Sequence, residues 1–187
     1  MTKKELRNHY KKLRENLSAE DVETKSMAIA NMALQGTFWH KQIYHIYLPI
    51  IANKEVDTEF LLQILSGKDK DIVVSKADFS SRSMTHFLLT DSTKFVVNSH
   101  GIPEPENGFE VNPEKIEVVF MPLLAYDIKG NRVGYGKGFY DNFLRKCTPE
   151  TIKIGLSFFE PETEIDGIFE GDIPMDFCIT PSKIYSF

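Results

Sequence analysis

The chain has 187 residues, with 22 Lys and Arg against 27 Asp and Glu, which gives a formal net charge of −5. This length predicts a single domain over residues 1–187, large enough to form a core without disulfides or structural metals. The mild acidity argues against a nucleic-acid-binding domain, because such domains usually carry a basic face. No apolar run approaches the ~20 residues needed to cross a bilayer.

The N-terminus and the cysteines indicate a compartment. The chain begins Met-Thr-Lys-Lys-Glu and continues with charged residues, so no secretory signal is predicted. Cys147 and Cys178 form neither a disulfide framework nor a C-x-x-C metal motif, and both are interpreted as packing residues. We therefore expect a cytoplasmic protein. Nucleic-acid and membrane partners are not expected from the charge and the apolar runs, and a monomer or weak dimer is the expected state.

The first segment has the periodicity of a helix. Its apolar side chains recur at intervals of four, three and four residues: Leu6, Tyr10, Leu13 and Leu17. Its basic side chains form a second stripe on the adjacent flank: Lys3, Arg7, Lys11 and Arg14. A charged stripe on a helix is usually a solvated face, and the alternative is a set of phosphate contacts. Ser18, with Asp21 three residues later, predicts the start of a second helix that ends near Gly36.

From residue 43 the pattern changes to short apolar, β-branched runs separated by turns. We predict strands at 43–48, 71–75, 84–89, 116–121, 152–156 and 177–180, and helices at 56–66 and 139–147. Residues 100–113 hold three prolines and two glycines, which predicts an ordered loop or a lid. Strands that alternate with helices predict an α/β fold, a single-domain three-layer sandwich with a mostly parallel sheet and helices on both faces. Ligands of such sheets bind at the carboxyl ends of the strands.

The glycine-rich segment at residues 127–141 carries the strongest functional signal. Gly134, Gly136 and Gly138 follow a predicted strand and lead into a predicted helix. Glycine allows the backbone to approach a ligand closely, and free N–H groups at the start of a helix attract phosphate. The segment is neither a Walker A loop nor a G-x-G-x-x-G fingerprint. The alternative interpretation is a flexible turn followed by an acidic helix start.

Charged residues beside these glycines strengthen the phosphate interpretation. Arg132 and Lys137 bring positive charge, and Asp141 could hold Mg²⁺ that bridges nucleotide phosphates. Glu55 follows the first predicted strand and is interpreted either as a first-turn helix acid or as an acceptor for the N–H edge of a heterocycle. Asp172 and Asp176 precede the last predicted strand, as solvated loop residues or as support for a metal or phosphate site. The five histidines show no zinc-binding spacing.

Two stretches together resemble the signature of the 5-formyltetrahydrofolate cyclo-ligase family, also called 5,10-methenyltetrahydrofolate synthetases. They are Met-Pro-Leu-Leu-Ala-Tyr-Asp at 121–127 and Gly-Asn-Arg-Val-Gly-Tyr-Gly-Lys-Gly-Phe-Tyr-Asp at 130–141. Weaker matches follow in the family's order at residues 3–7, 55–58, 102–105, 171–172 and 176, so that the resemblance covers nearly the whole chain. Tyr135 stands where some relatives carry Arg, His100 and Gly101 stand where some carry an aromatic residue, and the segment 49–54 is longer than in some relatives.

The resemblance implies an α/β enzyme that converts 5-formyltetrahydrofolate and ATP into 5,10-methenyltetrahydrofolate, ADP and phosphate, with Mg²⁺. In the mechanism that it implies, the formyl oxygen attacks the γ-phosphate, and N10 then closes the ring as phosphate leaves. Such a reaction needs positioning and charge neutralisation but no protein nucleophile. Two other functions stay open on the residues alone: a module that binds folate or nucleotide without turnover, and a kinase for another small molecule.

The resemblance also implies roles for individual residues. ATP would contact Lys3, Lys4, Glu5, Leu6, Arg7, Arg132, Val133, Gly134, Tyr135, Gly136, Lys137, Gly138, Phe139 and Tyr140. The pterin would be held by Glu55, with Ile50 nearby and Tyr140 against the substrate. The metal would be served by Asp141 and Asp172. The catalytic group would comprise Lys137, Arg132 and Tyr140.

Overall fold

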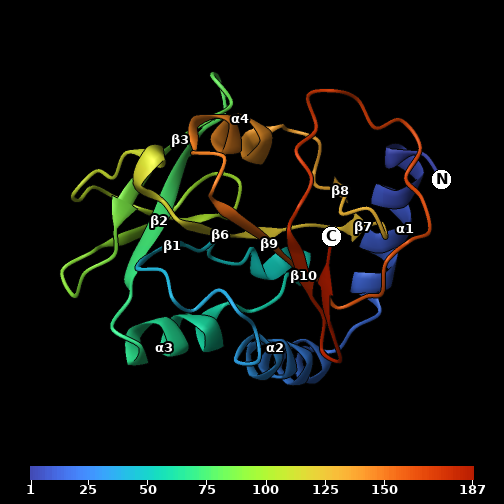
Figure 1. The fold of residues 1–187 in the computed structure, drawn as a ribbon, viewed down its shortest axis with the longest axis horizontal. Helices are drawn as coiled ribbons and strands as arrows, with labels where there is room; N and C mark the ends of the chain where they lie inside the picture. Colours follow the sequence, from blue (N-terminus) through green and yellow to red (C-terminus); the bar gives the residue numbers. More distant parts are fainter.

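A seven-stranded sheet forms the centre of the molecule in the computed structural model, which describes residues 1–187 (Figure 1). The strand order is β11-β10-β9-β6-β1-β2-β3. The inner strands from β10 to β2 run parallel, and the edge strands β3 and β11 are antiparallel to their neighbours. These strands are β1 (Ile43–His45), β2 (Asp71–Asp78), β3 (Ser83–Leu88), β6 (Val118–Pro122), β9 (Ile152–Leu156), β10 (Phe177–Ile179) and β11 (Ile184–Ser186).

Four helices and two small hairpins surround this sheet. The helices are α1 (Lys3–Glu15), α2 (Ala19–Ala33), α3 (Glu59–Gly67) and α4 (Phe139–Lys146), with 3₁₀ turns η1 (Ile51–Asn53) and η2 (Pro113–Lys115). The hairpins pair β4 (Phe95–Val97) with β5 (Pro103–Pro105), and β7 (Ala125–Tyr126) with β8 (Arg132–Val133). No helix combines the length and apolar character that crossing a membrane requires.

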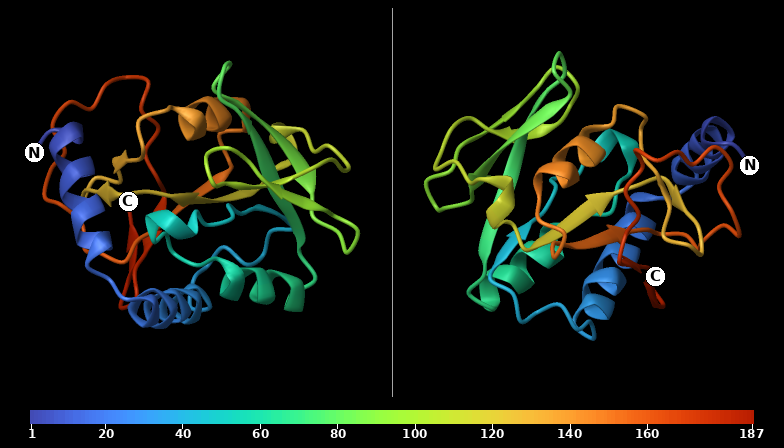
Figure 2. Two further views of the ribbon diagram at one scale, coloured as in Figure 1. Left: turned by 180° about the vertical axis from the view of Figure 1, so that it is seen from behind. Right: turned by 45° about the horizontal axis from the view of Figure 1, so that its top comes forward.

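The helices lie on both faces of the sheet, which confirms the predicted fold class. Helices α2 and α3 cover one face and α4 covers the other (Figure 1, Figure 2). Because side chains alternate along a strand, Val118 and Phe120 of β6 pack in the α2–α3 core, and Val119 and Met121 pack in the α4 core. A third core lies at one end of the sheet, where Leu6 of α1 packs against the β7–β8 hairpin.

Most predicted elements are confirmed, with changes at their ends. Ser18 caps α2 in a capping box with Asp21, as predicted. The predicted helix at 56–66 begins only at Glu59, and the Thr58 hydroxyl just before it donates to the Tyr47 carbonyl at 2.7 Å. Strand β1 ends at His45, earlier than predicted. The predicted loop at 100–113 contains strand β5.

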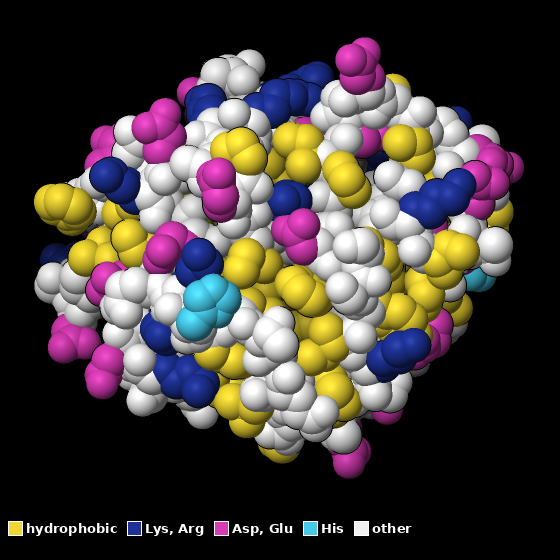
Figure 3. Space-filling model, in the orientation of Figure 1, with side chains coloured by type: hydrophobic (Ala, Val, Ile, Leu, Met, Phe, Trp, Pro, Cys, Tyr) yellow, Lys and Arg dark blue, Asp and Glu magenta, His cyan; other side chains and the backbone are white.

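The two cysteines pack in or against a core, and charges of both signs are mixed on one face of the surface (Figure 3). Cys147 and Cys178 are free thiols that pack in or against the α4 core, as the interpretation as packing residues predicts. On the face seen in Figure 3, acidic and basic side chains are interspersed with apolar ones. That face therefore carries no large field of one sign.

Candidate active site

A cavity of about 370 Å³ lies at the carboxyl ends of β1, β2 and β6. Its lining comes from these strand ends, from α1, from the segments 47–55, 100–104 and 132–141, and from Phe79, Met84 and Asp172. This is the edge at which a parallel sheet binds ligands, as the sequence predicts. One cavity thus collects side chains from both ends of the chain.

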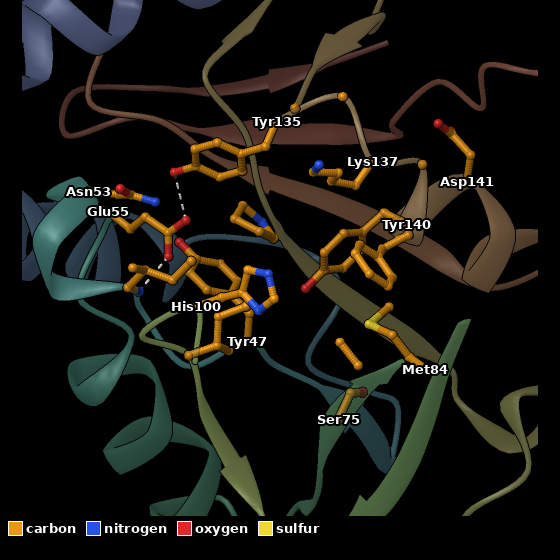
Figure 4. A pocket seen from close by; sticks show the side chains of 18 of the residues that line it. Tyr47, Asn53, Glu55, Ser75, Met84, His100, Tyr135, Lys137, Tyr140 and Asp141 are labelled. Carbon is orange, nitrogen blue, oxygen red and sulfur yellow. Dashed lines mark hydrogen bonds between the residues drawn. The ribbon is translucent and has the colours of Figure 1, made fainter. Parts of the chain in front are cut away.

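The glycine-rich segment forms one wall of the cavity. Gly136 and Gly138 have φ angles of +88° and +75°, in the left-handed region that favours glycine. Gly138 is the N-cap of α4, and no side chain caps that helix. Lys137, between the two glycines, is exposed and points toward the cavity (Figure 4). Uncapped N–H groups next to an ammonium group form a suitable environment for phosphate.

Three side chains of the basic stripe of α1, Lys3, Arg7 and Arg14, bond other parts of the protein, so the interpretation as a solvated face holds only for Lys11, which is exposed. The Arg7 Nε donates to the Gly134 carbonyl at 2.9 Å, and a Cβ at Gly136 would lie 3.2 Å from the Arg7 Cζ. Lys3 forms an ion pair with Asp172. Arg14 is buried, with 5% of its surface exposed. Helix α1 therefore brings two cations, Lys3 and Arg7, to the cavity wall.

Two carboxylates lie at the same end of the cavity. Arg132 Nη2 and the Ile173 N–H both donate to one oxygen of Asp141, Oδ1, at 2.8 and 3.1 Å. Lys3 and the Phe169 N–H both bond one oxygen of Asp172, Oδ2. The second oxygen of each carboxylate accepts no hydrogen bond from the protein.

This donor set fits a cation that is only partly held by protein. The chain has no group of three or more His, Cys, Asp or Glu side chains that could hold a metal. Mg²⁺ is often bound by one or two carboxylates together with water and substrate phosphates. The free oxygens of Asp141 and Asp172 suit that pattern, next to a wall suited to phosphate.

Glu55 lies at the opposite end of the cavity. It is 4% exposed and accepts hydrogen bonds from the Ile50 N–H and the Tyr135 hydroxyl, each at 2.7 Å (Figure 4). Burial raises the pKa of Glu55, and these two donors oppose that shift. Because α3 begins at Glu59, the interpretation of Glu55 as a first-turn helix acid was wrong. The longer segment before Glu55 forms η1 and places the backbone of Ile50 over the carboxylate.

Aromatic side chains line the space between the two ends. The ring of His100 stacks on Phe79 with centroids 3.8 Å apart and planes 9° from parallel. Tyr140 points into the cavity in Figure 4, and burial raises its pKa so that the hydroxyl stays protonated. A flat ring system fits such a wall.

A polar group on the cavity floor was not predicted from the sequence. Ser75 Oγ lies 2.8 Å from His45 Nε2 and 2.6 Å from His86 Nδ1. Burial lowers the pKa of His86 to about 4 and that of His45 well below its usual value, so both rings are neutral. These residues stand in strands without a motif, and only the pairing of Ser75 with His86 across β2 and β3 brings them together.

Some residues implied by the resemblance lie outside the cavity. Leu6 and Val133 are buried in the core beneath α1. Lys4 and Glu5 face solvent, and Glu5 completes the capping box of α1 with Thr2. None of these four lines the cavity. Asp176, one of the two candidate loop carboxylates, pairs with Lys153 at 2.9 Å and also lies outside the lining.

Known proteins resemble this chain over almost its full length. Residues 1–177 match the model of the 5-formyltetrahydrofolate cyclo-ligase family. The 5-formyltetrahydrofolate cyclo-ligase of Haemophilus influenzae is 28% identical over 177 residues, which cover 92% of this chain and 94% of that protein. The Mus musculus protein of the same name is 28% identical over 190 residues, covering 93% and 91%.

A solved structure has the same fold. The Aquifex aeolicus 5,10-methenyltetrahydrofolate synthetase matches with a TM-score of 0.82 at 28% identity, covering 100% of this chain and 93% of that one. The match of the family over residues 1–177, the shared fold and the resemblance of the glycine-rich segment agree. The chain belongs to the 5-formyltetrahydrofolate cyclo-ligase family.

Proposed function

We propose that the chain catalyses the ATP-dependent cyclisation of 5-formyltetrahydrofolate to 5,10-methenyltetrahydrofolate, with release of ADP and phosphate. The observation that carries this proposal is one cavity with two chemically different ends. One end has glycines and cations suited to a triphosphate, and the other has a buried carboxylate and stacked rings suited to a pterin. The reacting groups of the two substrates would meet between them.

The ATP end uses residues of α1 and of the segment 132–140. Lys3, Arg7 and Lys137 line this end and would bind the phosphates together with backbone N–H groups of Gly136 to Tyr140. Lys137 would stabilise the phosphoryl group during transfer, since it has no acidic partner in the protein. Arg132 would act on the same group through its pairing with Asp141. Asp141 and Asp172 would hold Mg²⁺, which offsets the negative charge of the phosphates when bound.

The folate end uses Glu55, Ile50 and Tyr140. A carboxylate accepts several hydrogen bonds, and two of those on Glu55 are already made by Ile50 and Tyr135. Its remaining acceptor capacity would bind the N–H edge of the pterin. Tyr140 and the stacked pair of His100 and Phe79 would pack against the ring system.

The chemistry follows from holding the two substrates in contact. The formyl oxygen attacks the γ-phosphorus and ADP departs, which converts a poor leaving group into a phosphate. N10 then bonds to the formyl carbon and gives up its proton, and phosphate departs. The protein supplies orientation and charge stabilisation rather than a nucleophile.

Purified protein with ATP, Mg²⁺ and 5-formyltetrahydrofolate tests this proposal. We expect the near-ultraviolet absorbance of the methenyl product to rise in step with ADP, and a chelator to stop both. Tight binding of either ligand without ADP formation would instead indicate a binding module. ADP formation with other acceptors, and not with 5-formyltetrahydrofolate, would indicate a different kinase.

A further inference from the structure

We propose that Tyr135 and Arg14 are positioning residues that hold Glu55 in its substrate-binding orientation, so that the glycine-rich segment also organises the folate end of the cavity. This inference rests on the proposed function, because it assigns roles at the same site. It gives Tyr135 a task other than the phosphate contact that the resemblance implies.

The three side chains form a continuous hydrogen-bonded chain. Arg14 Nη1 donates to the Tyr135 hydroxyl at 2.8 Å, and that hydroxyl donates to Glu55 Oε1 at 2.7 Å. The Tyr135 hydroxyl accepts one of these hydrogen bonds and donates the other, so it links the guanidinium group to the carboxylate. The Ile50 N–H binds the other oxygen, Oε2, and fixes the plane of the carboxylate from the opposite side.

Both ends of this chain are buried charges. Arg14 is 5% exposed and Glu55 is 4% exposed, and no direct hydrogen bond joins them, so the phenol of Tyr135 bridges the two. A buried charge is costly without donors or a counter-charge, so each end stabilises the ionised form of the other. The other titratable groups near Glu55 are Tyr47 and Tyr140, whose pKa values burial raises, so that they stay neutral. Arg14 is therefore the cation that balances Glu55.

Helix α1 holds this hydrogen-bonded group of side chains in place through two arginines, Arg14 and Arg7. Arg14 Nη2 also donates to the Leu123 carbonyl at 2.5 Å, which fixes the guanidinium to the chain that follows β6. Two helical turns earlier, Arg7 binds the Gly134 carbonyl, next to Tyr135. Tyr135 itself is a neutral phenol, and the positive charge beside it comes from Arg14 of α1. The orientation of Glu55 thus depends on the segment that would bind ATP.

The test is Tyr135→Phe, which keeps the ring and removes only the hydroxyl. We expect the KM for 5-formyltetrahydrofolate to rise about tenfold or more, as for loss of a hydrogen bond to a charged group. The KM for ATP should stay within about twofold. Loss of a donor raises the pKa of Glu55 further, so the acid limb of kcat/KM for the folate should move to higher pH. Arg14→Lys should change the same parameters in the same direction, because lysine keeps the charge but lacks the fork.

Two comparisons separate positioning from other roles. Tyr10→Phe is the matched control, because the Tyr10 hydroxyl also donates to a carboxylate, Glu162, at 2.7 Å but outside the cavity. It should leave both KM values unchanged. In a Glu55→Gln background, Tyr135→Phe should change the folate KM by less than about twofold, since a residue that acts through Glu55 has nothing left to position.

An unchanged folate KM in Tyr135→Phe, or an undiminished effect in the Glu55→Gln background, would overturn the inference while wild-type turnover upholds the proposed function. Absence of turnover by the wild type would overturn both. If Tyr135→Phe does not fold, the Arg14→Lys measurement decides alone: an unchanged folate KM there contradicts the inference.

Discussion

Lys137 lies between two glycines with left-handed backbone angles, and its ammonium group forms no ion pair with the protein. Because its charge is uncompensated, we expect Lys137→Ala to lower kcat about 10²-fold or more, as for loss of a group that stabilises a transferring phosphoryl. The rate of methenyl product formation measures this. Lys4→Ala is the matched control, since Lys4 is exposed and outside the cavity. Near-normal kcat in Lys137→Ala would remove the assigned role.

Glu55 combines a binding role with a cost in stability. Burial raises its pKa in the folded state, so the folded protein binds more protons than the unfolded chain between the two pKa values. Stability from this group is therefore present at low pH and is lost as pH rises through the folded pKa. We expect Glu55→Gln to weaken folate binding, while its Tm relative to wild type becomes more favourable from about pH 4 to about pH 8.

Asp21 provides a control of opposite sign for that experiment. The backbone and side chain of Ser18 lower the pKa of Asp21, so its stability contribution is present above the unfolded pKa and is lost as pH falls. The Tm of Asp21→Asn relative to wild type should become less favourable as pH rises from about 2 to about 4, and should then stay nearly constant up to about pH 8. If the Tm of Glu55→Gln relative to wild type instead became less favourable with rising pH, the folded-state pKa of Glu55 would be lowered and burial would not dominate its environment.

Individual residues show where prediction from sequence ends. The residue types at 132–141 indicated phosphate chemistry, because glycines and cations have few other reasons to alternate. The burial of Glu55 was not predictable, since its two donors come from a 3₁₀ turn and from a tyrosine 80 residues later in the chain. The Ser75, His45 and His86 group was missed for the same reason. Spacing in sequence carries no information on such long-range contacts.

At the scale of elements, α1 and α2 begin with equivalent caps, but only α1 contributes residues to the cavity. Thr2 and Ser18 each form a capping box, with Glu5 and Asp21 respectively. Removing either hydroxyl should cost about 1 kcal/mol, or roughly 2–4 °C in Tm for a chain of this length. We expect Ser18→Ala to change stability alone, and Thr2→Ala also to raise the KM for ATP, because Lys3 lies in the first turn of α1. Equal ATP KM values in the two variants would contradict this.

Element length decides which parts of the fold the sequence predicts. Helices with caps and an apolar stripe, and the five-residue strand β6, were predicted close to their observed positions. The short strands β4, β5, β7, β8 and β11 were missed, because two or three residues are too few to show alternation. Strands β1 and β10 are equally short, but each lies in a longer apolar run that predicts a strand. The stripe on α1 was assigned to solvent because its partners lie about 120 or more residues away.

At the scale of the whole molecule, the cavity is lined by several elements, so a ligand bound in it would contact all of them at once. Each ligand should therefore stabilise the folded state, by about 2.7 kcal/mol at a hundredfold excess over Kd. For a chain of this length that corresponds to roughly 5–10 °C in Tm. We expect Mg²⁺-ATP and 5-formyltetrahydrofolate each to raise Tm, and Lys137→Ala to reduce the ATP effect while the folate effect persists. Equal losses for both ligands would show that the two ends are not separate.

The docking of α1 on residues 134 and 135 has a consequence for biosynthesis. A ribosome delivers Arg7 and Arg14 early, when the backbone and phenol that they will hold have yet to be synthesised. Helix α1 can therefore dock only after residues 134 and 135 have been synthesised, so the active site forms late in translation. Fragments that split the chain between these regions should each be inert.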